Sequence, residues 1–261
     1  RTMLASDPRF IVPRVLPEFS TAHVICSTYE HGHSVSSQAV KDLPLERRSA
    51  LGKAALELFF RELFVWGEIQ TDPNFGNYRI RIAGEEGDDP GYDRIVLLDF
   101  GAVQSYSDDF LKPVIQMIRA SYENDLQAVI DGGVKLRFMS TEWPDEVLEK
   151  FGQVCMSVLE PLSSDKDAWP DYAVNSHGEY RWKQSELPSR VARQAARSAI
   201  SRYFRVPPKE FVFLNRKLIG VYTFVAVLNS EFNGEPLLRK YLYGEGDDAP
   251  DASATSQSTK A

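Results

Sequence analysis

Apolar residues recur along most of this chain with the spacing of an α-helix. Between Ser49 and Trp66 they form a single stripe, made of Leu51, Ala55, Leu58, Phe59, Leu63 and Trp66. Lys53, Glu57 and Arg61 lie four residues apart on the opposite face, where neighbouring charges can pair. This pattern predicts an amphipathic helix whose apolar side is buried.

Further segments show the same periodicity, at residues 107–122, 125–139, 143–159, 187–204 and 211–228. Ser107 can cap the first of them, with Asp108 and Asp109 favourably placed at its positive end. Pro144 opens the third, and Pro207 and Pro208 end the fourth. The sequence therefore predicts a mainly helical protein.

Short branched or alternating runs predict two β-hairpins. Residues 10–15 and 23–29 flank a polar turn, and residues 78–82 and 94–98 flank a polar, glycine-bounded turn at 84–91. Residues 95–98 are consecutive apolar residues, which is typical of a buried strand. Together with the helices, these hairpins predict an α+β fold that is predominantly α.

One long segment, residues 161–186, shows no clear period and is predicted to be an irregular loop. It contains Trp169, Tyr172, Tyr180 and Trp182, which can either pack onto the helices or form an apolar site for a polyprenyl tail. Packing is the favoured interpretation. Residues 244–261 are rich in Gly, Asp, Ala and Ser and are predicted to be a disordered tail.

Length, composition and charge limit the classes of protein to which this chain can belong. The chain has 261 residues, of which 43% are hydrophobic, so it can form one large domain with a full core. Its formal charge of −7 argues against a broad nucleic-acid-binding surface. Cys26 and Cys155 lie in separate apolar runs, which favours reduced thiols over a disulfide. No uninterrupted apolar run approaches the roughly 18 residues of a membrane span, so the sequence predicts a soluble or peripheral protein.

The candidate chemistry lies in two stretches near the middle of the chain. Gln70 to Asn77 contains Asp72 and Asn77 in the spacing D-x-x-x-x-N, and Asp99 follows the buried strand as part of Asp-Phe-Gly. In the kinase template the first Asp orients or deprotonates the attacking hydroxyl, while the Asn and the second Asp hold Mg²⁺ against the ATP phosphates. Either stretch alone is a weak signal. A predicted hairpin that joins the two is what a kinase active site requires.

These stretches resemble the signature of the AarF/UbiB/ADCK family of atypical kinases, which is associated with ubiquinone biosynthesis. Gln70-Thr71-Asp72 stands where ordinary protein kinases have His-Arg-Asp. Residues 17–21 and 215–220 also resemble the family, and the similarity extends from about Phe10 to about Asn233. Aminoglycoside and choline kinases usually begin the motif with His-Gly-Asp and fit less well.

The resemblance implies a protein-kinase-like fold that binds ATP and Mg²⁺. Asp72 would be the catalytic base, Asn77 and Asp99 the metal ligands, and the main chains of Thr28 and Glu30 the adenine-binding hinge. Residues 1–30 would be the last strands of a small lobe with the hinge, and residues 31–243 the helical large lobe. The phosphate-binding Lys of the family's Lys-x-Gly-Gln motif is not found before Phe10, and Lys41 and Lys53 follow the hinge. We therefore expect a fragment that represents mainly the large lobe.

The expected substrate is not a peptide. A new helix is predicted within six residues of Gly101, so there is no long activation segment on which a peptide could dock. This favours a lipid, a quinone precursor or another small molecule, or ATP hydrolysis coupled to a conformational task. Arg190, Arg193 and Arg197 form a basic helix face that is either solvated or in contact with anionic phospholipid. The corresponding location is the cytoplasm, or the inner face of a bacterial or mitochondrial membrane.

Two other functions remain open from the sequence. The chain can be a nucleotide-sensing pseudokinase scaffold for a membrane-associated biosynthetic complex, or a small-molecule kinase of the aminoglycoside or choline type. All three catalytic side chains are present, which counts against an inactive scaffold.

Overall fold

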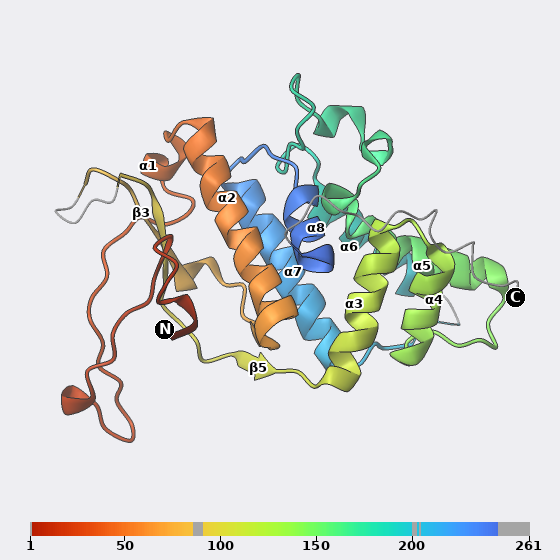
Figure 1. Ribbon diagram of the computed structural model, residues 1–261, viewed down its shortest axis with the longest axis horizontal. Helices are drawn as coiled ribbons and strands as arrows, with labels where there is room; N and C mark the ends of the chain where they lie inside the picture. Colours follow the sequence, from red (N-terminus) through yellow and green to blue (C-terminus); the bar gives the residue numbers. More distant parts are fainter. Residues whose placement is uncertain (1, 86–90, 200–202, 204, 245–261) are drawn as a thin grey trace, which may run out of the picture.

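The computed structural model describes residues 2–85, 91–199, 203 and 205–244. Its α-helices are α1 (Gln38–Lys41), α2 (Leu45–Phe60), α3 (Asp108–Tyr122), α4 (Leu126–Lys135), α5 (Asp145–Ser157), α6 (Leu187–Ala199), α7 (Lys209–Val227) and α8 (Glu235–Tyr243). Its strands are β1 (Phe10–Ile11), β2 (Glu68–Gln70), β3 (Tyr78–Arg81), β4 (Arg94–Leu97) and β5 (Val103–Ser105). Helices α2 to α8 lie together, β3 and the N-terminal segment lie on one side of them with α1, and β5 runs below α2 and α7 (Figure 1).

The centre of the helical part is the packing of α2 against α7, which lie side by side although they are far apart in sequence (Figure 1). The apolar stripe predicted for 49–66 is confirmed, since Leu51, Leu58 and Leu63 are buried. The helix starts at Leu45 and continues through a π-helical turn, Arg61–Trp66, that ends at Gly67. This wider last turn leads directly into β2 and thus into the D-x-x-x-x-N motif.

Five further helices were predicted from periodicity, and all five are present in the described chain as α3 to α7. Asp108 and Asp109 lie in the first turn of α3 as expected. The consecutive helices α3, α4 and α5 pack one against the next. The large helical cluster that results includes Leu56, Val114 and Val225 in its core.

The strands form two small sheets. In the first, the order is β1-β4-β3, with β4 antiparallel to β3 and parallel to β1. In the second, β2 pairs antiparallel with β5. The hairpin predicted for 78–98 is thereby confirmed as β3 and β4, while residues 86–90 of its turn lie outside the described residues. Leu98, predicted to be buried, is 39% exposed at the end of the strand.

The N-terminal hairpin is only partly formed. Residues 10–15 and 23–29 do run antiparallel, because Leu16 N donates to Cys26 O and Thr28 N to Arg14 O. Only Phe10–Ile11 is a regular strand, and it pairs with β4 instead of with the other arm. The arm projects away from the helices (Figure 1), and Phe19 and Ile25 are largely exposed on it.

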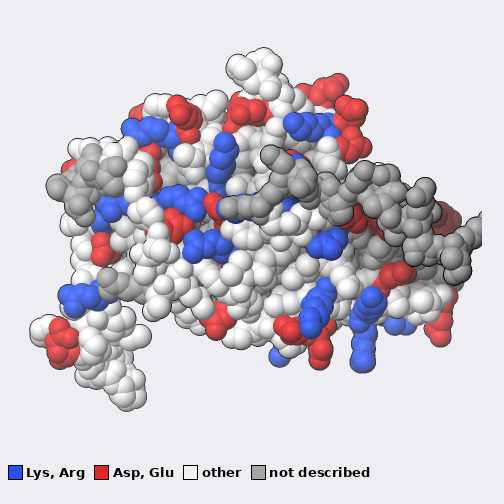
Figure 2. Space-filling view, in the orientation of Figure 1, with Lys and Arg blue, Asp and Glu red and all other residues white. Residues whose placement is uncertain are grey.

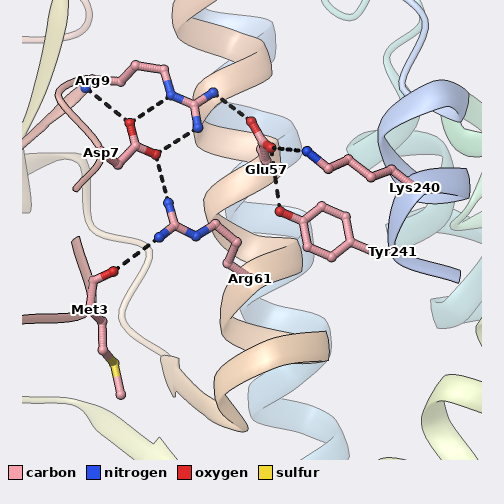
Figure 3. A network of polar contacts seen from close by, with 7 residues as sticks. All are labelled: Met3, Asp7, Arg9, Glu57, Arg61, Lys240 and Tyr241. Carbon is pink, nitrogen blue, oxygen red and sulfur yellow. Dashed lines mark hydrogen bonds and ion pairs between the residues drawn. The ribbon is translucent and has the colours of Figure 1, made fainter. Parts of the chain in front are cut away.

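An ion-pair network ties the first residues of the chain to the helices (Figure 3). Arg9 bridges Asp7 and Glu57, with N–O distances of 2.7 and 2.6 Å. Arg61 also contacts Asp7, and Glu57 accepts from Tyr241 on α8. Segments from both ends of the described chain are thus joined across α2.

The irregular segment 161–186 is fixed mainly by its aromatic side chains. Trp169, Tyr180 and Trp182 are buried in the helical core, which confirms packing for these three. Tyr172 is exposed. The tail from residue 245 onward lies outside the described residues.

The sequence also predicts reduced cysteines and no membrane-spanning helix. Cys26 and Cys155 are both free. Among the described residues, no helix has the length and apolarity that a membrane span requires. The architecture is α+β and predominantly α, as predicted.

Candidate active site

The two small sheets bring the predicted catalytic residues to one place. Asn77 immediately precedes β3 and Asp99 follows β4, and in an antiparallel pair the start of one strand lies beside the end of the other. The Leu98 amide donates to the Asn77 carbonyl at 2.9 Å, which fixes this register. Asp72 follows β2, and the Thr71 amide donates to Ala102 O just after the Asp-Phe-Gly motif.

Asp72 and Asn77 are in direct contact. The side-chain nitrogen of Asn77, Nδ2, donates to Asp72 Oδ2 at 3.0 Å. The side-chain oxygen of Asn77, Oδ1, is therefore directed away from this carboxylate. Asp99 is exposed, and its Oδ1 accepts from the Gly101 amide at 2.7 Å. The structure therefore places all three predicted side chains around one end of the β3–β4 hairpin.

Gln70 holds the two motifs together. Its side-chain oxygen accepts from the Asp72 amide at 2.7 Å, and its side-chain nitrogen donates to the Asp99 carbonyl at 2.8 Å. Gln70 is buried, so both bonds form where water does not compete. The sequence identified Gln70 only as part of the family motif. A polar residue at the end of a buried strand was the signal for this positioning role.

Helix α7 packs against the loop that carries Asp72 and Pro73. Arg216 donates to Asp72 Oδ1 at 3.2 Å, with its side chain about half exposed. One turn further on, Gly220 lies against Pro73, and a Cβ atom at position 220 would be 2.1 Å from the Pro73 Cβ. The stretch 215–220, which resembled the family in sequence, is thus the surface of α7 that faces the catalytic loop.

A buried ion pair lies beneath the loop. Lys217 Nζ is 2.9 Å from Glu62 Oε2, and both residues are buried. Burial alone would lower the pKa of Lys217, but the Glu62 carboxylate and the Tyr78 hydroxyl hold that pKa above its ordinary value. The pair joins the π-helical turn, α7 and the start of β3, and these are the elements that carry the site. Neither Glu62 nor Lys217 was predicted from the sequence as part of it.

The predicted hinge residues lie beside the same hairpin. The Thr28 amide donates to Arg14 O, and the Thr28 hydroxyl donates to Glu30 Oε1. Glu30 pairs with Arg81 of β3 at 2.9 Å. These contacts attach the segment to the sheet, and the adenine-binding role of Thr28 and Glu30 stays a prediction.

The donor set of the site fits a magnesium ion that is shared with phosphate. Asn77 and Asp99 supply one amide and one carboxylate oxygen, which are the hard ligands that Mg²⁺ prefers. Among the described residues, those of this site included, no group of three or more His, Cys, Asp or Glu side chains is arranged to hold a metal. Two protein ligands completed by substrate phosphates are the usual form of such a site.

Comparisons with known proteins agree with this geometry. Residues 1–132 match the family model of the ABC1 atypical kinase-like domain. The chain belongs to this family. The resemblance to the AarF/UbiB/ADCK atypical kinases is confirmed, and the family match favours it over the aminoglycoside and choline kinases.

Similar curated proteins are longer than this chain. A probable serine/threonine-protein kinase, abkA, of Dictyostelium discoideum is 25% identical over 85% of the chain and 37% of the relative. The mitochondrial atypical kinase coq-8 of Caenorhabditis elegans is 26% identical over 94% of the chain and 30% of the relative. The mitochondrial atypical kinase COQ8 of Saccharomyces cerevisiae is 21% identical over 91% and 43%. The chain thus spans about a third of the length of these relatives.

A solved structure supports the fold assignment. The Mycobacterium tuberculosis protein Rv3197, determined as a complex with erythromycin, matches with a TM-score of 0.60 at 16% identity. The match covers 93% of this chain and 55% of the other. The fold is therefore kinase-like, with a large helical part and a β-hairpin at the site.

The three arginines of the predicted basic face of α6 differ in their surroundings. Arg190 forms two hydrogen bonds to the Glu160 carboxylate, at 2.6 and 2.9 Å, and so takes part in packing. Arg193 and Arg197 are exposed. On the face shown in Figure 2, acidic and basic side chains are intermixed.

Proposed function

We propose that this protein is a Mg²⁺- and ATP-dependent atypical kinase or ATPase that supports ubiquinone biosynthesis. The observation behind this proposal is the convergence of Asp72, Asn77 and Asp99 at one end of the β3–β4 hairpin. The COQ8 relatives support the same class of activity. Because the chain spans about a third of these relatives, the activity is proposed for the intact protein.

In this function Asn77 and Asp99 hold the metal, and Asp72 faces the acceptor. When bound, Mg²⁺ neutralises charge that develops on the phosphate oxygens. The hydroxyl oxygen of the acceptor would form a bond to the γ-phosphorus while the bond from that phosphorus to ADP breaks. Asp72 would accept the proton that this hydroxyl loses. Arg216 would orient the Asp72 carboxylate before the acceptor arrives, through its contact with Asp72 Oδ1.

The nucleotide would reach this site from the sheet side of the molecule. We assign residues 1–30 to the last strands of a small lobe and the hinge, and residues 31–243 to the large lobe. The Thr28 amide already donates to Arg14, so adenine would meet the remaining main-chain groups of Thr28 and Glu30. Residues 244–261 would be a tail without a role in catalysis.

A lipid or other small molecule is the acceptor that fits best. Only β5 and three further residues separate the Asp-Phe-Gly motif from α3, which leaves no long segment for docking a peptide. We propose a quinone precursor as the acceptor, in keeping with a role in ubiquinone biosynthesis. Arg193 and Arg197 would meet anionic phospholipid at the inner face of a membrane.

The function is tested by exchanging each carboxylate for its amide. Asp99→Asn should weaken Mg²⁺-ATP binding at least tenfold, because a metal ligand is lost. Asp72→Asn should retain binding and abolish phosphate release, because only the proton acceptor is lost. Binding is measured by calorimetry and turnover by phosphate release, with and without anionic liposomes.

Asp131→Asn, on the exposed surface of α4, is the matched control and should behave like the parent. If both active-site variants release phosphate like the parent, the assignment is wrong. If the parent binds nucleotide but never turns it over, the protein is a nucleotide-sensing scaffold.

A further inference from the structure

A groove beside the loop of Asp72 lies next to an apolar cavity in the helical part. The groove has a volume of about 480 Å³ and lies between Pro73, α6 and α7, with Arg216 and Ile219 among its walls. An apolar cavity of about 240 Å³ lies behind it, among α2, α3, α5 and α7. Val191 and Asn215 line both spaces, so the groove and the cavity lie on either side of these two side chains.

The cavity is built almost wholly from apolar side chains. Phe59, Val114, Phe151, Leu214 and Leu218 are typical of its walls. Close-packed protein cores rarely leave voids much larger than a water molecule. A cavity of about 150 Å³ with such walls stays dry and binds benzene. The physical chemistry therefore favours an apolar occupant for this larger space.

The shape of the space limits what that occupant can be. A polypeptide segment would bring backbone amides and carbonyls into an apolar cavity, where they have no partners. A second copy of the chain or a membrane surface can cover the groove but cannot fill the cavity. A nucleotide is too polar for these walls. A slender apolar tail that enters between Val191 and Asn215 meets none of these objections.

The outer end of the groove has different chemistry. Pro73 adjoins Asp72 in sequence, and Arg216, which lines the groove, donates to the Asp72 carboxylate at 3.2 Å. A hydroxyl at this end would therefore lie close to a proton acceptor and a cation. The apolar cavity and the polar outer end of the groove differ in chemistry as the two ends of an amphiphile do.

We propose that the groove and the cavity together bind the acceptor, a single-chain amphiphile with a hydroxyl head and an apolar tail. The head lies beside the paired Asp72 and Arg216 side chains, and the tail fills the cavity. This proposal rests on the proposed function, in which the head oxygen bonds to the γ-phosphorus, its proton passes to Asp72 and ADP departs. It adds the location and chemical class of the acceptor site.

The test measures binding without any turnover. Linear primary alcohols of increasing length displace a fluorescent apolar probe, N-phenyl-1-naphthylamine, from the 261-residue chain. Each added methylene should raise affinity about fourfold until the cavity is filled, since burial contributes about 0.8 kcal/mol per CH₂. Farnesol is the parallel arm that distinguishes an isoprenoid tail from a linear one.

Two variants locate the site. Val191→Trp, at the junction, and Ala192→Trp, on the exposed wall of the groove, should each weaken long-chain binding at least tenfold. Asp131→Trp, on the exposed surface of α4 and not among the residues that line either space, should leave it unchanged. Ala192 is at the surface, so its variant remains informative if Val191→Trp fails to fold.

Affinity that does not depend on tail length, or that survives Ala192→Trp in a folded protein, overturns the proposal. The result is independent of the activity assays. Length-dependent binding without phosphate release would contradict only the proposed function. Phosphate release without length-dependent binding would contradict only the acceptor site.

Discussion

At the scale of single residues, the site depends on polar groups that are satisfied inside the protein. Gln70 joins the amide of Asp72 to the carbonyl of Asp99, and both bonds are sheltered from water. A lost bond here leaves a buried donor or acceptor without a partner, which costs about 1–3 kcal/mol. It also frees the two motifs to move relative to each other.

We therefore expect Gln70→Ala to reduce phosphate release by roughly 100-fold, since misplacement of about 1 Å has that effect. The affinity for Mg²⁺-ATP should change much less, because Asn77 and Asp99 are unaltered. Steady-state kinetics and calorimetry separate the two effects. Gln153→Ala, on the exposed side of α5, serves as the control. Unchanged kinetics in Gln70→Ala would mean that this residue does not position the loop.

The residues that sequence reasoning found and missed differ in a physical way. Asp72, Asn77 and Asp99 belong to local motifs whose spacing is visible along the chain. Glu62 and Lys217 are far apart in sequence, and their ion pair exists only because α2 and α7 pack together. A charged residue within an apolar helical pattern indicates a buried partner but does not say which one.

At the scale of elements, α7 determines where the catalytic loop can lie. Its Gly220 is in contact with Pro73, one residue from Asp72. Glycine in a helix interior normally costs about 1 kcal/mol relative to alanine. The absence of a side chain at this position is therefore best explained by the close approach of the loop.

Gly220→Ala should consequently destabilise the protein by about 1–3 kcal/mol, the usual cost of overpacking, in spite of its gain in helix propensity. Its new methyl group would also displace Pro73, so turnover should fall together with stability. Urea unfolding gives the free energy and phosphate release gives the activity. The sign of the stability change is decisive, because a more stable Gly220→Ala protein would show that α7 and the loop are not tightly packed.

Helices and strands were predicted correctly from the sequence where the pattern that defines them is local. Helices α2 to α7 were predicted because their periodicity is local, and the β3–β4 hairpin because its strands are neighbours in the chain. The N-terminal arm was predicted as a regular hairpin. It is less regular because β1 pairs with β4, a distant strand, and this partner could not be read from residues 10–29.

At the scale of the whole molecule, the fold is held by contacts between segments that are distant in sequence. The network of Asp7, Arg9, Glu57 and Arg61 links the first residues to α2, and Tyr241 links α8 to the same point (Figure 3). The kinase-like fold was predicted from the motifs and their resemblance. The cavity was not, since a void arises from how helices pack and leaves no pattern along the chain.

Burial of ionisable groups in this core predicts a limit to stability at high pH. Burial raises the pKa of the Cys155 thiol to about 12. In the unfolded chain a thiol loses its proton near pH 8.5. Between these values the folded protein binds more protons than the unfolded chain, so stability must fall as pH rises. Tyr106 and Tyr243, whose pKa values burial raises to about 12, add to the loss above about pH 10.

Between pH 9 and pH 10 the thiol should account for about 1 kcal/mol of this loss. Urea midpoints measured at pH 8, 9 and 10 give the slope for the parent and two variants. Cys155→Val removes this partly buried thiol and should lose clearly less stability over this interval. Cys26→Val, which removes the thiol on the projecting arm, should follow the parent. An equally steep loss in Cys155→Val would show that the thiol beside the cavity is not shielded from water, and the cavity itself would then be wet.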